Sequence, residues 1–225
     1  FGRDPATSPR PPILIIGEGI DFDLKEDEVN YAGGAALRAN YNPKFAMNVN
    51  FVSGFSSFPS YVDSVVKQNN VYPGWGRVYY KENGLHSWQY YSGYCSFSPN
   101  KVFNFQIGHD KQFWGDGYRS LFLSDNAAPY SFLKITTTVW KLKYVSMYAM
   151  MTDATHPSNT KNNFKKKYGT FHMLSWNVTK RINLNLFESI IWQGNDANRS
   201  RSYDVNYLNP LIFFRPLEYS VGSSD

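Results

Sequence analysis

Apolar and polar residues alternate one by one in several stretches of the chain. Between residues 45 and 51 every second side chain is large and apolar, and those between are alanine or asparagine. The same period recurs over residues 102–108 and 181–186. Successive strand residues point to opposite faces of a sheet, so this pattern predicts strands with one apolar face. We expect about ten strands, near residues 13–24, 29–42, 45–55, 85–98, 101–112, 131–140, 142–152, 167–179, 181–193 and 211–222.

The connections between these strands are of two kinds. Tight turns are expected at Asn42–Lys44, Pro99–Asn100, Trp140–Lys141 and Thr179–Lys180. Connections of roughly 15–30 residues are expected around 56–84, 113–130, 153–166 and 194–210, and from the third strand onward the two kinds alternate. Short turns at one end and long loops at the other are typical of outer-membrane barrels. The strands of a soluble β-sandwich also alternate apolar and polar residues, but nothing requires the long loops of a sandwich to lie at one end.

The first long connection contains the pattern of one amphipathic helix. Pro59 stands near its start, and apolar residues recur at positions 58, 61, 62, 65 and 66. Proline is favoured in the first helical turn, and the spacing gives one apolar stripe. We expect a short helix over residues 58–67 that lies in the lumen as a partial plug or rests on the rim.

Composition and charge narrow the possible classes of protein but do not distinguish a soluble β-protein from a membrane barrel. The 225 residues suit one domain, residues 1–225, with 18% aromatic residues, 42% hydrophobic residues and a mean hydropathy of -0.46. Apolar runs such as Ile13–Ile16 are too short for a membrane-spanning helix, and the single Cys95 allows no internal disulfide. The net charge is +5, and the positive residues are most concentrated at Lys165–Lys167. We interpret this run as a solvated loop rather than as a site for an anionic partner. No cofactor motif and no nucleic-acid-binding pattern is present.

One segment with dense polar and aromatic residues leaves a strand and enters a long connection. It spans residues 108–120 and contains Trp114, Asp116, Tyr118 and Arg119. Ring stacking combined with polar contacts suits carbohydrate recognition, so these four are candidate glycan contacts. The alternative is a structural loop in which Gly115 and Gly117 permit tight turns. An acid–base or metal cluster is also conceivable from His109, Asp110 and Asp116. No further group of ligand residues at a diagnostic spacing supports it.

A second segment, residues 204–220, places two charges in an aromatic strand. On a lipid-facing side an arginine such as Arg215 would cost about 2–4 kcal/mol, and Glu218 would also be unfavourable there. We therefore expect them to point into the lumen as a structural charge pair rather than as a ligand site. His172, in an apolar strand, is expected to be a structural histidine with satisfied hydrogen bonds rather than a ligand.

These segments resemble Bacteroidota relatives of the capsule-assembly Wzi family, including the gliding-motility RemB-like branch. The likeness rests on Gly108–Lys111, Gly115–Leu121 and Leu123–Asp125, on Lys134–Thr137 with Trp140, Lys141 and Tyr144, and on Tyr207–Pro210, Phe214–Pro216, Glu218–Ser220 and Gly222–Ser223. It covers most of the region from about Phe51 to Asp225. The resemblance implies a bacterial outer-membrane barrel of roughly eighteen strands, without catalysis, that attaches capsular polysaccharide or serves gliding motility.

The chain stops where family members continue, and its end lacks the terminal aromatic residue of a complete barrel. We therefore expect the N-terminal portion of a larger transmembrane antiparallel β-barrel. Unpaired edges cannot face lipid, so missing strands or a partner must cover them. Expected partners are outer-membrane lipid, a surface polysaccharide, and a larger outer-membrane assembly or the barrel-insertion machinery. Two alternatives stay open: a soluble periplasmic or surface β-sandwich that binds carbohydrate, and a glycan-processing enzyme using Asp110, Asp116 or Glu218.

Overall fold

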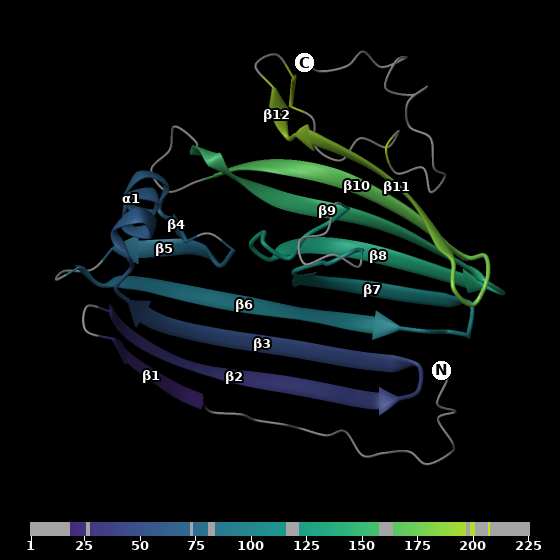
Figure 1. Cartoon of the computed structure of the whole chain (residues 1–225), viewed down its shortest axis with the longest axis horizontal. Helices are drawn as coiled ribbons and strands as arrows, with labels where there is room; N and C mark the ends of the chain where they lie inside the picture. The colour runs from purple at the N-terminus through teal and green to yellow at the C-terminus, as the bar shows by residue number, and fades with distance from the viewer. Residues whose placement is uncertain are drawn as a thin grey trace.

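The structure, a computed structural model, describes residues 19–25, 28–72, 74–80, 84–115, 122–157, 164–196, 199–200 and 207. These residues form an all-β fold with one short helix (Figure 1). The long strands are β1 (Gly19–Lys25), β2 (Glu28–Asn42), β3 (Phe45–Ser56), β6 (His86–Phe97), β7 (Phe103–Asp110), β8 (Tyr130–Val139), β9 (Leu142–Pro157), β10 (Phe164–Asn177) and β11 (Asn183–Gln193). The smaller elements are α1 (Ser60–Asn69), β4 (Val71–Tyr72), β5 (Gly76–Tyr80), β12 (Asn195–Asp196) and β13 (Arg199–Ser200).

The nine long strands form one antiparallel meander. Each strand pairs with the next long strand along the chain, in the order β1-β2-β3-β6-β7-β8-β9-β10-β11. β5 pairs with the start of β6, and β7 pairs with its end, so both lie along the same edge of β6. Among the described residues β1 and β11 do not pair with each other, so this sheet is open.

Most of the strand pattern predicted from the sequence is confirmed. Nine of the ten expected strands are present, and the expected tenth, near 211–222, lies outside the described residues. The four tight turns lie where they were expected, at one end of the sheet, and α1 confirms the expected helix (Figure 1). The expected long loop at 153–166 is wrong, because β9 and β10 extend to Pro157 and Phe164. Consequently Lys165–Lys167 lies in β10 and not in a loop.

One face of the sheet, which we name the open face, presents large apolar side chains to the surroundings. Directly paired residues share a face, so the register places Val49, Ile107 and Leu133 on it together. Ile107, in the middle of β7, is 62% exposed. The exposed apolar residues of this face are Tyr31, Val49, Phe51, Phe55, Tyr91, Phe97, Phe103, Phe105, Ile107, Leu133, Val139, Leu142, Trp176, Leu184 and Leu186.

The opposite face, which we name the covered face, carries the core. α1 and β5 bury Val66 and Val78 against Trp88 of β6. The segment after β7 buries Trp114 against residues of β8, β9 and β10, namely Phe132, Met147 and Phe171. Two long connections therefore fold back over this face of the sheet instead of extending away from it.

A small region of the open face is also covered, at the long-connection end of β9–β11. Tyr207 packs with its ring centroid 4.9 Å from that of Trp192, and its carbonyl accepts a hydrogen bond from Thr170. Beside it His172 is fully buried, and its Nδ1 lies 2.9 Å from the Tyr144 hydroxyl. No helix among the described residues is long and apolar enough to cross a bilayer.

Candidate functional site

Helix α1 is fixed to the covered face by its apolar stripe and by its ends. Val62 and Val66, one turn apart, pack in the cluster around Val78 and Trp88. The helix follows Pro59, and its last turn is closed by Asn70, whose left-handed φ of 54° directs its backbone N–H to the Val66 carbonyl. The chain then reverses into the β4–β5 hairpin, so α1 and this hairpin form one unit over β6.

A hydrogen bond between the Asp63 carboxylate and His86 anchors α1 to the sheet. Asp63 Oδ1 lies 2.8 Å from Nε2 of His86, and Asp63 Oδ2 lies 2.6 Å from Nζ of Lys67. His86 is fully buried and belongs to β6. Hydrogen bonds from Lys67 first, and then from His86, hold the pKa of the Asp63 carboxyl below its ordinary value. The carboxylate is therefore charged at neutral pH and joins the helix to the sheet.

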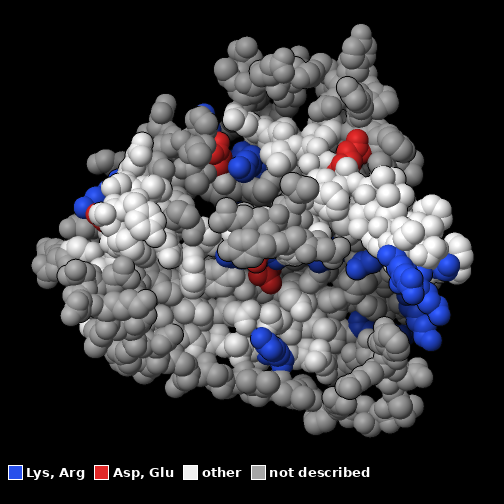
Figure 2. Space-filling model, in the orientation of Figure 1, with Lys and Arg blue, Asp and Glu red and all other residues white. Residues whose placement is uncertain are grey.

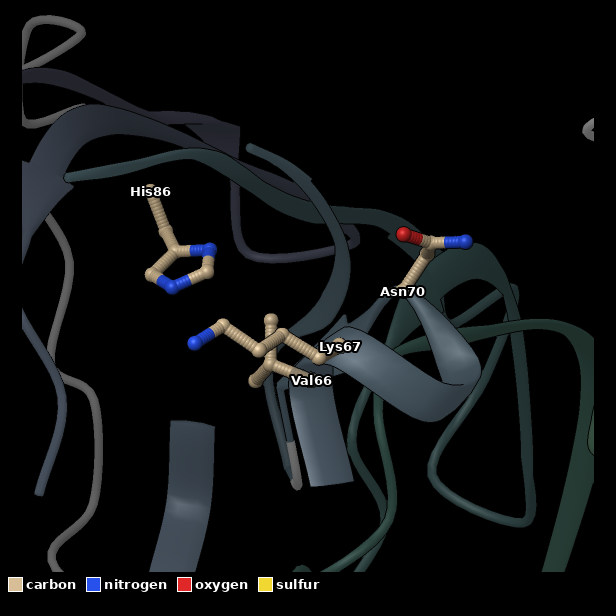
Figure 3. A pocket seen from close by; sticks show the side chains of 4 residues that line it. All are labelled: Val66, Lys67, Asn70 and His86. Carbon is tan, nitrogen blue, oxygen red and sulfur yellow. The ribbon is translucent and has the colours of Figure 1, made fainter. Parts of the chain in front are cut away.

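A hollow of about 260 Å³ opens between α1 and β6 at this anchor (Figure 3). Val66, Lys67, Asn70 and His86 line it, and the Lys67 side chain extends toward the His86 side of the hollow while Asn70 points away (Figure 3). The only carboxylate beside the imidazole among the described residues is Asp63, which is already bonded to it. We interpret this hollow as part of the anchor, because Lys67 and His86, which line it, are each already bonded to Asp63.

An aromatic cluster lies beside the anchor and reaches the surface at Trp75. The Trp75 ring packs edge-on against Trp88 and Tyr90, with centroids 4.8 and 5.2 Å away, and stacks on Tyr72 at 6.1 Å. Phe58 stacks between Tyr72 and His86. Trp75 is 37% exposed, so part of an otherwise firmly held indole ring is open to a ligand.

Polar groups from the next long connection lie close to Trp75. Gly74, at φ 78°, sits so near this connection that a β-carbon there would lie 3.2 Å from the Asn126 carbonyl oxygen and 3.7 Å from Lys111 Nζ. The Lys111 ammonium lies 5.9 Å from the Tyr90 ring centroid. A partly exposed indole near an ammonium and a backbone carbonyl offers a sugar ring a stacking surface and hydrogen-bonding groups. We call Trp75, Lys111 and Asn126 the Trp75 site.

Trp114, the first predicted glycan contact, is a core residue. Only 7% of it is exposed, and its ring packs edge-on against Phe171 and Phe187. Its backbone N–H donates to the Leu123 carbonyl at 2.9 Å. The ring therefore has little free surface for a sugar, and glycan contact by Trp114 stays a prediction.

The other predicted site residues are either separated or outside the described residues. His109 and Asp110 are neighbours on β7 and point to opposite faces: His109 stacks on Tyr91 of the open face, while the Asp110 carboxylate accepts from the Lys111 backbone N–H. Asp116, Tyr118, Arg119, Arg215 and Glu218 lie outside the described residues. Within the part of the chain that the structure describes, no three His, Cys, Asp or Glu side chains group as a metal site would require.

The turn sequence around Trp75 could have indicated this site, although the alternation of apolar and polar residues does not mark it. Pro73-Gly74-Trp75-Gly76 combines turn residues with an indole, which places an aromatic side chain at the tip of a turn. Loop tips held by a rigid scaffold are where binding residues concentrate.

Comparison with protein-family models, curated proteins and solved structures gives no match. The resemblance to the Wzi family therefore remains an expectation that rests on the sequence motifs named above.

Proposed function

We propose that this chain forms part of the wall of a bacterial outer-membrane β-barrel and has a non-enzymatic role at the cell surface. The observation that carries the proposal is the open face, where fifteen large apolar side chains are exposed on eight neighbouring long strands. Exposed apolar patches of this extent mark contact with another protein or with a membrane. An outward apolar band on tilted antiparallel strands is the lipid-facing surface of such barrels.

The covered face supports the same proposal. It carries polar residues such as Asn104, Gln106 and Lys134 on β7 and β8, together with the two inward-folded connections. Lys134 Nζ donates to Gln112 at 2.8 Å. A polar interior filled by folded loops fits a barrel lumen. The alternative β-sandwich requires a second layer over the open face, and the exposure of Val49, Ile107 and Leu133 argues against it.

Cys95 provides a test without any added probe site. It is the only cysteine of the sequence and lies on the open face of β6, beside Ile107 of β7. We expect that in intact membranes Cys95 reacts with a membrane-soluble maleimide and resists a quaternary-ammonium thiol reagent, because lipid excludes the charged reagent. Mass spectrometry of the protein after labelling measures both reactions.

A cysteine on the other face of the same sheet is the matched control. In a C95S background, Q106C places the thiol on the covered face of β7, where the charged reagent is expected to react if that side lines a watery lumen. Fast reaction of native Cys95 with the charged reagent in intact membranes would contradict a lipid-facing position. Reaction of Cys95 with neither reagent until denaturation would favour the β-sandwich.

Within this role we propose that the Trp75 site contacts a surface polysaccharide. Trp75 lies at the long-connection end, which faces the exterior in an outer-membrane barrel. Its ring is held by Tyr72, Trp88 and Tyr90, so stacking on a sugar costs little ordering of the indole.

Trp75→Ala is expected to lower the polysaccharide retained on washed cells about two- to tenfold, because one aromatic stacking contact contributes ~0.5–1.5 kcal/mol. Trp140→Ala, at a 78% exposed tryptophan in a tight turn at the opposite end, is the control and should retain the wild-type amount. Unchanged retention in Trp75→Ala, with defective gliding in the same cells, would favour the motility role instead.

A further inference from the structure

All four tight turns at one end of the sheet carry lysine. Lys44 lies between β2 and β3, Lys101 between β6 and β7, Lys141 between β8 and β9, and Lys180 between β10 and β11. Lys143 and Arg181 follow within two residues, and all six cations are exposed. No acidic residue stands in any of these turns. Figure 2 shows Lys and Arg gathered at the right edge of the molecule, where Figure 1 places the turns.

None of these six cations forms an ion pair within the described part of the chain. The Asp63–Lys67 ion pair lies at the opposite end of the sheet. Lys141 donates to the Val178 carbonyl at 3.5 Å and lies 5.1 Å from the ring centroid of Trp140. We name Lys44, Lys101, Lys141, Lys143, Lys180 and Arg181 the basic turn belt; its charge has no counter-ion on the described sheet.

Aromatic residues separate this belt from the apolar open face. Tyr41, Trp140 and Trp176 are exposed within four residues of the turns. Phe103, Phe105 and Leu184 begin the apolar band, and Leu184 lies at the level of Trp176, with which it is directly paired. Tyrosine and tryptophan prefer the level of the lipid headgroups, where the ring is in the acyl region and the polar atom in water. Near the turn ends of β2, β8 and β10 the order is thus cation, amphipathic ring and strand interior, while on β7 and β11 the apolar residues Phe103 and Leu184 follow Lys101 and Arg181 without such a ring.

From this order we infer that the basic turn belt binds the phosphate groups of anionic phospholipids in the leaflet at the turn end. The inference rests on the proposed membrane role, and it adds a lipid preference that an apolar face alone does not give. A phosphate at headgroup depth lies just beyond Tyr41, Trp140 and Trp176, where the ammonium groups can reach it. A soluble anionic polymer would also meet the cations, but it would not require a ring of aromatic residues and an exposed hydrocarbon face directly behind them.

Tryptophan quenching by brominated lipids tests the inference on the full-length protein in bilayers. Trp140 and Trp176 lie at the turn end and report lipids that adjoin the belt. Brominated phosphatidylglycerol is expected to associate about fivefold more strongly than brominated phosphatidylcholine, because one nearby lysine adds ~1 kcal/mol of attraction to an anionic surface. High salt should reduce this preference, since exposed charges are screened.

Two triple variants that remove the same number of charges test whether the preference for phosphatidylglycerol comes from the basic turn belt. K44Q/K101Q/K180Q removes three belt cations, and K165Q/K166Q/K167Q removes three cations near the other end of β10. We expect the first to reduce the preference for phosphatidylglycerol, with Lys141, Lys143 and Arg181 still present, and the second to keep the wild-type preference. All six side chains lie on a strand or turn surface, and far-UV circular dichroism checks that both variants keep the sheet.

Each remaining outcome is decisive. Equal quenching of the wild-type protein by the two lipids overturns the belt as an anionic-lipid site while leaving the membrane role intact. Equal loss of preference in both triple variants, or a preference unaffected by salt, also overturns it, since the effect would not come from these cations. Quenching by neither lipid means that the chain does not adjoin a bilayer, and both the inference and the proposed function fail.

Discussion

Trp114→Ala is expected to destabilise the protein by about 3–5 kcal/mol, the usual cost of truncating a buried aromatic side chain to alanine. The indole is buried among Phe132, Met147 and Phe171, and it meets Phe187 edge-on at 6.1 Å. Removing it leaves a cavity that the surrounding strands, fixed by their register, cannot close. The backbone bridge between Trp114 and Leu123 loses its packing at the same time.

Denaturant titration followed by far-UV circular dichroism measures this change in the free energy of unfolding. Phe113→Ala is the matched control, because Phe113 is the adjacent aromatic residue and is 42% exposed. We expect it to cost less than about 1 kcal/mol, as substitutions at exposed positions usually do. If the two variants proved equally stable, Trp114 would not be a core residue, and its predicted role as a glycan contact would regain support.

The sheet was predictable because its information is local. Alternation over residues 45–51 and 102–108 specifies β3 and β7, and the Asn42–Lys44 and Trp140–Lys141 turns specify which strands are neighbours. Two consecutive strands that are joined by a tight turn pair with each other as antiparallel neighbours. The four tight turns therefore specify the pairs β2–β3, β6–β7, β8–β9 and β10–β11, while pairs joined by long connections, such as β3–β6 and β7–β8, do not follow from them.

The path of the long connections was not predictable in the same way. Whether Trp114 faces a ligand or the core depends on Phe171 and Phe187, which are distant in sequence and meet it only after β10 and β11 are in register. The hairpin of β4 and β5 is also too short to show a period, and its pairing with β6 is fixed by α1 above it. The aromatic density at residues 108–120 thus marked a buried segment at Trp114, while the exposed indole lies in the shorter turn at Trp75.

Ile107→Lys is expected to prevent stable assembly in membranes, with a cost of about 2–4 kcal/mol for a lysine at the lipid-facing midplane. Ile107 is in the middle of β7 on the open face and is 62% exposed. If that exposure were to water, the same substitution would change the free energy of unfolding by less than about 0.5 kcal/mol, as surface substitutions do. The size of the effect therefore identifies the solvent that the open face meets.

The neighbouring residue supplies the control, because Gln106 differs from Ile107 in the face it occupies and not in its depth along β7. Gln106→Lys places the same charge on the covered face, near Lys134 and Ser96, where a watery lumen would tolerate it. Membrane-fraction yield and denaturant titration in lipid vesicles measure both variants. A severe loss in Ile107→Lys with a mild one in Gln106→Lys supports lipid on the open face. Tolerance of both substitutions means that water or another protein covers the open face. Equal loss in both variants means that neither face of the sheet is in contact with water.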